Sequence, residues 1–218
     1  MIIDLSHEIA DGMVTYPGLA APELRVVISR EESATRLDSG ASFEIESLTL
    51  VGNTGTYLDS PFHYHQAEAD LARLPLDRLV NVPIAMVRAP GQLAVTASDL
   101  GDLGRLAGCA VLVQTGWDQH WGTPRYLELD CPHLTAAAVG ALIDARVAIV
   151  GIDSLNIDDP SDTSRPAHQR LLRAGIPIIE HLTNLGSVPD TWSRLIALPA
   201  PVRRMASFPV RAVAVIGE

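Results

Sequence analysis

Short runs of apolar residues recur along the whole chain, and most of them are bounded by Gly, Pro, Asn or Asp. Runs of this length and punctuation are typical of β-strands. The pattern predicts strands at residues 2–5, 24–28, 43–51, 82–87, 110–115, 147–152, 176–179, 195–198 and 212–216.

Fewer segments have the composition of a helix. Residues 136–145 are strong helix formers that follow Thr135, a suitable N-cap. Residues 166–173 begin with Pro166 and are followed by Gly175, as is common at the two ends of a helix. A shorter helix is expected from Thr96 or Ser98 to Leu103. Helices alternate with strands only in the second half, which predicts an α+β fold, dominated by strands, in one domain over residues 1–218.

Composition narrows the class of protein. Hydrophobic residues make up 47% of the chain, enough for a substantial core, and the formal net charge is −10 with no Lys at all. An acidic chain with scattered arginines does not favour nucleic acid or an anionic membrane as a partner. The opening residues reach a charge at Asp4, unlike a signal peptide, and no apolar run approaches the roughly 18 residues of a membrane span. We therefore expect a cytoplasmic protein whose partners are neither nucleic acid nor a membrane.

The densest polar cluster, residues 52–65, directly follows an apolar run. Gly52 and Gly55 permit a tight turn or a close approach to a ligand. Asp59 and His63 are a carboxylate and an imidazole, which together can bind a metal or transfer a proton. The competing interpretation is a polar turn in which both side chains only satisfy backbone groups.

A second polar group lies far along the chain. His168 falls near the start of the helix expected at 166–173, and Glu180 follows the strand at 176–179. A carboxylate at the end of a buried strand is costly to bury unless it is paired or bound to a metal. The alternative is that Glu180 is already in solvent.

Residues 53–63 resemble the signature of the cyclase family, which includes bacterial kynurenine formamidase and isatin hydrolase. That signature reads His-x-Gly-Thr-His-x-Asp-x-Pro-x-His, and Gly55, Thr56, Asp59, Pro61 and His63 match it in register. Further similar segments follow in order along nearly the whole chain, at residues 4–7, 12–13, 16–18, 74–77, 115–117, 150–153, 166–168, 179–180 and 195–199.

The resemblance implies an α+β fold of the swivelling β/β/α type, assembled as a homodimer or larger homo-oligomer. It also implies hydrolysis of an amide or lactam-like bond in a small, often aromatic substrate. Carried over to this chain, it makes Asp59, His168 and Glu180 metal ligands and His63 the catalytic acid and base.

Two positions depart from the family signature. Asn53 and Tyr57 stand where the signature has its first two histidines, which belong to the first of two metal sites. An amide oxygen or a neutral phenol is a much weaker ligand for Zn²⁺ or Mn²⁺ than an imidazole. A binuclear centre is therefore not expected.

Our leading hypothesis is a hydrolase of a small amide, lactam or lactone with one divalent ion, Zn²⁺ or Mn²⁺, on Asp59, His168 and Glu180. The ion would activate water, and His63 would move its proton. Tyr57 and Asn53 would bond the substrate oxygen, so Tyr57 joins the catalytic candidates. One alternative is a metal-free cyclase, isomerase or lyase that uses Asp59 and His63 for proton transfer. The other is a catalytically inactive small-molecule binding protein.

Other aromatic and histidine side chains carry weaker expectations. Trp117, with Trp121, could wall a substrate pocket or could instead anchor a polar loop. His181 has no evident partner in the sequence, so an exposed or capping role is expected for it.

Overall fold

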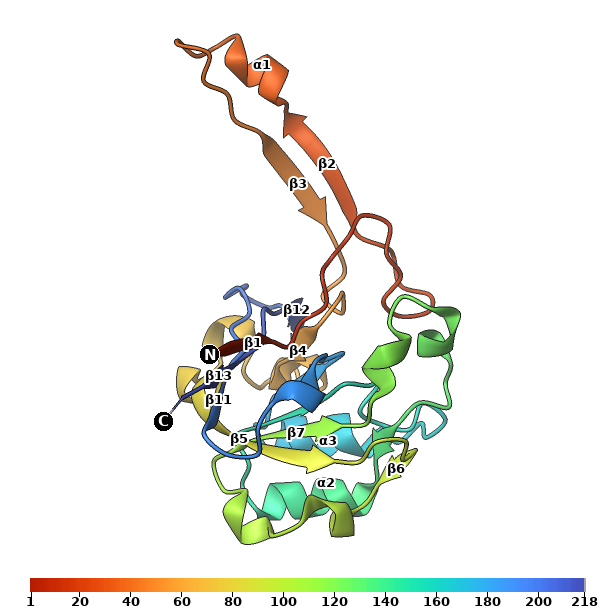
Figure 1. Cartoon of the computed structure of the whole chain (residues 1–218). Helices are drawn as coiled ribbons and strands as arrows, with labels where there is room; N and C mark the ends of the chain where they lie inside the picture. Colours follow the sequence, from red (N-terminus) through yellow and green to blue (C-terminus); the bar gives the residue numbers. More distant parts are fainter. Residues whose placement is uncertain (218) are drawn as a thin grey trace.

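A mixed sheet of nine strands forms the centre of the computed structural model, which describes residues 1–217. Strands β5, β7, β9 and β10 run parallel to one another, and the remaining neighbours are antiparallel (Figure 1). In spatial order the strands are β1 (Ile2–Asp4), β13 (Val213–Ile216), β11 (Ser193–Ile196), β5 (Val80–Arg88), β7 (Ala110–Gln114), β9 (Ile149–Ile152), β10 (Ile178–Glu180), β4 (Tyr57–Asp59) and β12 (Ser207–Pro209).

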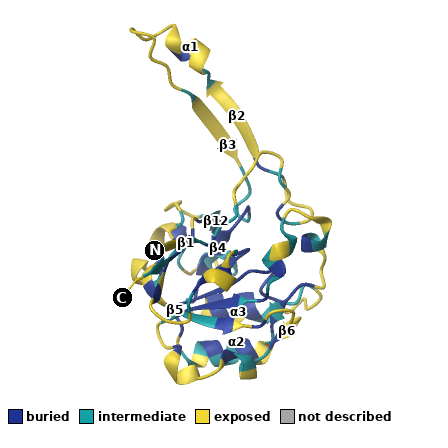
Figure 2. Cartoon of the chain, viewed as in Figure 1, coloured by how far each residue is buried: buried dark blue, intermediate teal, exposed yellow. Residues whose placement is uncertain are grey.

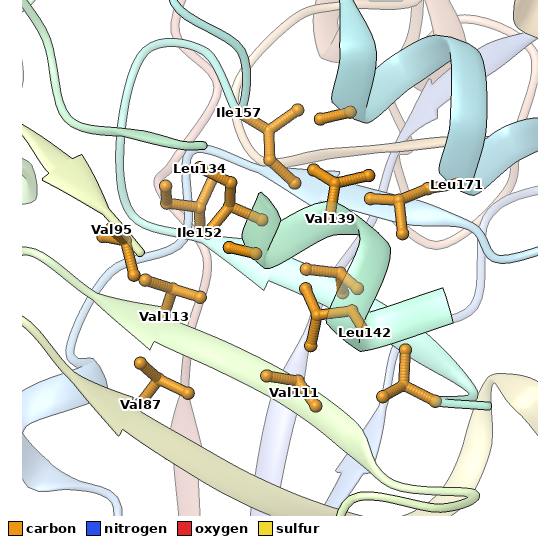
Figure 3. Packing of buried hydrophobic residues seen from close by; sticks show 14 of the residues in the cluster. Val87, Val95, Val111, Val113, Leu134, Val139, Leu142, Ile152, Ile157 and Leu171 are labelled. Carbon is orange, nitrogen blue, oxygen red and sulfur yellow. The ribbon is translucent and has the colours of Figure 1, made fainter. Parts of the chain in front are cut away.

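Apolar side chains cover both faces of this sheet. On one face Val111, Val113 and Ile152 pack with Val139 and Leu142 of helix α2 (Ala136–Asp144), and helix α3 (Pro166–Arg173) joins the same cluster (Figure 3). The intervening residues of the same strands belong to a separate cluster on the opposite face. Successive side chains of a strand point to opposite faces, and a parallel sheet is normally buried on both. The apolar runs of the central strands follow from this double burial.

Gly151 shows how closely the second face is packed. A Cβ atom at this position would lie 2.6 Å from Cδ1 of Leu182 and 2.9 Å from Cδ2 of Leu112. Such distances are inside van der Waals contact, so any side chain at this position would require both leucines to shift.

The two main helices lie where the sequence predicted them, whereas the prediction of a third helix was wrong. The Thr135 side chain accepts a hydrogen bond from the Ala138 N–H at the start of α2, as expected of an N-cap. The segment from Thr96 to Leu103 instead forms two 3₁₀ helices, η4 (Ala97–Leu100) and η5 (Leu103–Arg105). Gly101 between them has φ +69°, which interrupts a right-handed helix.

The remaining elements are short. A parallel pair of strands, β6 (Ala94–Val95) and β8 (His133–Leu134), lies outside the main sheet. Further 3₁₀ helices are η1 (Pro61–His63), η2 (Leu71–Arg73), η3 (Leu76–Arg78), η6 (Trp117–His120), η7 (Pro124–Leu127) and η8 (Leu185–Ser187). Every predicted strand is present, whereas the short strands β4, β6, β8 and β12 were missed, so the strand-dominated α+β class is confirmed. No helix within residues 1–217 combines the length and apolar character needed to cross a membrane.

One segment leaves the body of the molecule as an arm (Figure 1). It consists of β2 (Glu23–Ile28), α1 (Arg30–Ala34) and β3 (Ile45–Thr49), with β2 and β3 paired antiparallel. Nearly all of its residues are exposed, including the apolar ones (Figure 2). The sequence predicted both strands, but their apolar residues do not enter the core.

Candidate functional site

Strand β4 places the first group of polar side chains. It lies between β10 and β12, and its register sets Tyr57 opposite Glu180 and Asp59 opposite Ser207. Cross-strand partners have neighbouring side chains on one face, and residues two apart on a strand share that face. Sheet geometry therefore brings Tyr57, Asp59, Glu180 and Ser207 together from distant parts of the sequence.

Hydrogen bonds fix these side chains but leave one oxygen free. The Tyr57 hydroxyl donates to Oε2 of Glu180, and the Ile157 N–H donates to Oε1 of Glu180 at 2.6 Å. The Ser207 hydroxyl donates to Oδ1 of Asp59. Asp59 is fully buried, yet its Oδ2 has no hydrogen-bond partner in the described residues. Buried polar atoms are seldom left unpaired, so this oxygen is available to a ligand.

Helix α3 supplies His168 from its first turn. Nδ1 of His168 lies 2.6 Å from Oδ2 of Asp158, which also accepts the backbone N–H of His168 at 3.0 Å. Oδ1 of Asp158 accepts the backbone N–H of Ala167 at 2.6 Å. Because the Asp158 carboxylate accepts a hydrogen bond from the Nδ1–H of His168, the other ring nitrogen, Nε2, faces Asp59 Oδ2 at 3.7 Å and Glu180 Oε1 at 3.8 Å. A carboxylate behind an imidazole in this way is the usual support of a metal-binding histidine.

Sequence reasoning did not single out Asp158. It lies in the loop before α3, among several acids and serines. No local spacing distinguishes it, because its partner is the helix terminus and imidazole that the fold brings to it.

His63 completes the cluster from η1. One ligand atom each of Asp59, His63 and His168 can be chosen so that all lie within 4.8 Å of one another. Nδ1 of His63 also lies 3.4 Å from the Ser207 hydroxyl. His63 can therefore serve either as a fourth polar group beside a ligand or as a ligand itself.

Burial and neighbouring charges shift the pKa values of these groups. Burial lowers the pKa of His168, but the Asp158 and Asp59 carboxylates outweigh burial and raise it to about 10. Burial raises the pKa of Glu180 to about 7, with the His168 charge opposing. Burial lowers the pKa of His63, which leaves this imidazole neutral near pH 7 and able to accept a proton.

The buried charges suit a divalent cation. The carboxylates of Asp59, Asp158 and Glu180 surround the single imidazole of His168, and all four side chains are buried. Even with a protonated imidazole this group has an excess of negative charge, which is costly in a low-dielectric interior. A divalent ion would offset that excess, and nitrogen and oxygen donors of this kind bind Zn²⁺ and Mn²⁺.

A cavity of about 290 Å³ opens onto this cluster. His63, His168, Glu180 and Tyr57 line it, together with Asn53, which the sequence analysis placed at the substrate. Sequence reasoning missed other lining residues, namely Tyr16, Leu19, Tyr64, Asn156 and Arg165. The volume suits a small molecule.

Several sequence expectations need correction. Trp117 is not among the residues that line this cavity: it packs in a separate cluster with Tyr126 and Leu155, and its indole N–H donates to the Tyr126 carbonyl at 3.2 Å. These contacts fit the loop-anchoring role, one of the two that the sequence left open for Trp117. His181 is fully buried and its Nε2 lies 3.0 Å from the Leu155 carbonyl oxygen, so the expected exposed role was wrong. The solvated alternative for Glu180 is wrong as well, since only 1% of the residue is exposed.

Known proteins resemble the chain in both sequence and fold. The sequence profile of the family described as putative cyclase matches residues 3–159. Kynurenine formamidase from Salinibacter ruber is 30% identical over 217 residues, covering 97% of this chain and 96% of the relative. The Bacillus cereus protein of that name is 28% identical over 215 residues, covering 97% and 95%. Isatin hydrolase A from Labrenzia aggregata superposes with a TM-score of 0.85 at 20% identity, covering 100% of this chain and 94% of that structure.

Proposed function

The chain belongs to the putative cyclase family, and from this membership and the geometry of the cluster we propose that it hydrolyses a C–N bond of a small amide or cyclic amide. The relatives named as kynurenine formamidases match this chain over nearly its whole length, which supports amide hydrolysis as the reaction class. We do not extend their substrate to this chain, because Asn53 and Tyr57 change the residues around the reacting groups.

The observation that carries the proposal is the convergence of buried acids on one imidazole. Asp59, His168 and Glu180 come from β4, α3 and β10, and Nε2 of His168 lies 3.7 and 3.8 Å from the two carboxylates. These residues would hold one divalent ion, Zn²⁺ or Mn²⁺. When bound, such an ion lowers the pKa of a water molecule and polarises a carbonyl group.

The protein's own residues perform the proton transfer and the positioning. His63 accepts the proton of the attacking water and delivers it to the leaving nitrogen, since its pKa is lowered and it is neutral near pH 7. Asp59 stays ionised: although burial opposes this, the neighbouring imidazoles of His168 and His63 and the hydrogen bond from Ser207 lower its pKa. Tyr57 holds Glu180 in place through its hydroxyl, and Asn53 offers an amide to the substrate from the wall of the cavity.

Metal analysis and substrate screening together test this proposal. Protein purified without chelators should contain one equivalent of Zn or Mn and should hydrolyse simple aryl formamides. His168→Asn should lose the ion. His63→Asn should keep the ion but lose rate by roughly 10²–10⁴-fold, as expected of a general base. His120→Asn, a histidine outside the cavity, serves as the matched control.

The outcomes separate the alternatives. Loss of the ion in His63→Asn would make His63 a ligand and end its assignment as the base. Full activity in protein stripped of divalent ions would refute the metal and favour proton transfer by Asp59 and His63 alone. An ion-loaded protein that hydrolyses no amide, lactam or lactone would refute the enzyme assignment.

We also propose that a second copy of the chain covers the exposed arm, as the family resemblance implies for a homo-oligomer. Leu24 and Leu48 pair across β2 and β3, and with Val26 they expose 54%, 51% and 58% of their surface. A two-stranded hairpin is marginally stable in water without such cover. Light scattering should find a dimer or larger assembly that Leu24→Glu dissociates and that Leu76→Glu, at an exposed leucine elsewhere, leaves intact.

A further inference from the structure

We infer that Arg165 forms an anion subsite in the cavity, and that the substrate is a small amide carrying a carboxylate. This inference rests on the proposed hydrolysis and adds to it the chemical class of the substrate. Arg165 directly precedes α3 and is half-buried in the wall of the cavity, beside Tyr64 and Asn156.

The Arg165 guanidinium is poorly satisfied by the protein. Nη1 lies 3.4 Å from Oδ1 of Asn156, and Nη2 lies 3.3 Å from the carbonyl oxygen of Pro160. Both distances exceed the usual N–H···O distance of about 2.9–3.0 Å. A guanidinium has more N–H donors than these two contacts use. Arg165 therefore keeps donor capacity for a ligand.

Acids on the same loop do not pair with this guanidinium. Asp158 is bonded to His168, Asp159 to Ser161 and Asp162 to Ser164. Within residues 1–217 no carboxylate lies within ion-pair distance of Arg165. An arginine left without a carboxylate, in a loop rich in acids, favours an external anion as its partner.

The backbone at this residue is held in an unfavourable conformation. Arg165 has φ +46° and ψ +59°, in the left-handed region that non-glycine residues seldom occupy. The conformation costs on the order of 1–3 kcal/mol and must be held by the surrounding structure, as it is at seven other non-glycine residues of the described chain. It sets Arg165 at the start of the same helix that carries His168 three positions later.

The chemistry of the cavity points to a carboxylate in particular. Apart from tyrosines, the other ionisable groups lining it are the acid Glu180 and the imidazoles of His63 and His168, which are engaged in the proposed reaction. A planar guanidinium binds a carboxylate through paired hydrogen bonds, which gives both affinity and orientation. A carboxylate held there would orient the amide group toward His63.

A pair of isosteric substrates tests the subsite. We compare 2-formamidobenzoate with its neutral isostere 2-formamidobenzamide; hydrolysis adds water across the C–N bond and releases formate with the free aryl amine. The wild type should favour the anion in kcat/KM by roughly 10–100-fold, the range of a charge-assisted hydrogen bond. Arg165→Gln should abolish the preference, by raising KM for the anion far more than KM for the neutral amide. Arg165→Lys should restore part of it, and Arg173→Gln, at an exposed arginine of α3, should keep all of it.

Different failures have different meanings. An equal loss on both substrates in Arg165→Gln would assign the residue a structural role and overturn the inference. Equal kcat/KM values for both substrates in the wild type would overturn it too, while leaving the hydrolase intact. If neither amide is hydrolysed, the proposed function fails, and calorimetric binding of the two compounds to wild type and Arg165→Gln decides the subsite independently. Arg165-dependent preference for the anion would support it, and its absence would overturn it.

Discussion

Replacing Asp158 with Asn removes the charge behind His168 while nearly keeping the size of the side chain. Asp158 accepts three hydrogen bonds, from Nδ1 of His168 at 2.6 Å and from the backbone N–H groups of Ala167 and His168 at 2.6 and 3.0 Å. An asparagine offers only one oxygen, and its amide hydrogens oppose the Nδ1 proton when they face it. The substitution therefore weakens control over which ring nitrogen carries the proton.

The expected loss in metal affinity follows from that role. Removing the hydrogen-bonded partner of a metal-binding histidine typically weakens metal binding by roughly 10–100-fold, which corresponds to about 1.4–2.7 kcal/mol. The helix itself should persist, because the asparagine oxygen can still accept a backbone N–H at the start of α3. We therefore expect a folded protein with a weakened metal site.

Competition with a chromogenic chelator measures this change directly. Metal-free wild type, Asp158→Asn and Asp159→Asn are titrated with Zn²⁺ at constant pH and ionic strength, and circular dichroism verifies that each is folded. Asp159 is the matched control, since it lies next in sequence but bonds to Ser161. An unchanged dissociation constant in Asp158→Asn would refute the proposed support of His168. Equally weakened Zn²⁺ binding in both variants would mean that the effect arises from the net charge of the loop.

The remaining predictions concern stability. Tyr57→Phe should lower the free energy of unfolding by roughly 1–3 kcal/mol, because Glu180 then loses a buried donor. Tyr126→Phe should cause no such loss, because the buried Tyr126 hydroxyl has no partner in the described residues; urea titrations compare the two, and equal losses would contradict the reasoning. Burial lowers the pKa of His7 from 6.5 to about 4, with Asp118 opposing, so the unfolded chain binds this proton first as the pH falls. Stability should therefore decrease between pH 6.5 and about 4, and less steeply in His7→Gln; identical pH profiles would count against a half-buried, neutral His7.

Local patterns in the sequence were sufficient to predict most of the main strands and helices. The apolar runs at 110–115 and 147–152 became the buried strands β7 and β9, because a strand covered on both faces needs apolar residues throughout. Thr135 and Pro166 marked the starts of both main helices through capping and backbone constraints that act over a few residues. These signals depend only on residues close in sequence, so they can be recognised without knowledge of the fold.

Family resemblance named the polar residues, but their arrangement depends on contacts between distant segments. Asp59 meets Ser207 across a separation of 148 residues, and Tyr57 meets Glu180 across 123. Strand β4, which makes both contacts, is only three residues long and was interpreted as part of a polar loop. A strand so short has too few residues to show a period, and only its place between β10 and β12 makes it one.

The same limit explains why the sequence left the role of Trp117 open and why Asp158 and Arg165 were omitted. An aromatic side chain packs against a loop or lines a cavity according to what lies opposite it, and the spacing of Trp117 in the sequence carries no information about that neighbour. The partners of Asp158 and the unpaired guanidinium of Arg165 likewise exist only once the loop folds back onto α3. Periodicity and capping reflect interactions within one element, so they predicted the elements. Charge pairing, burial and cavity shape arise between elements, so they required the folded chain.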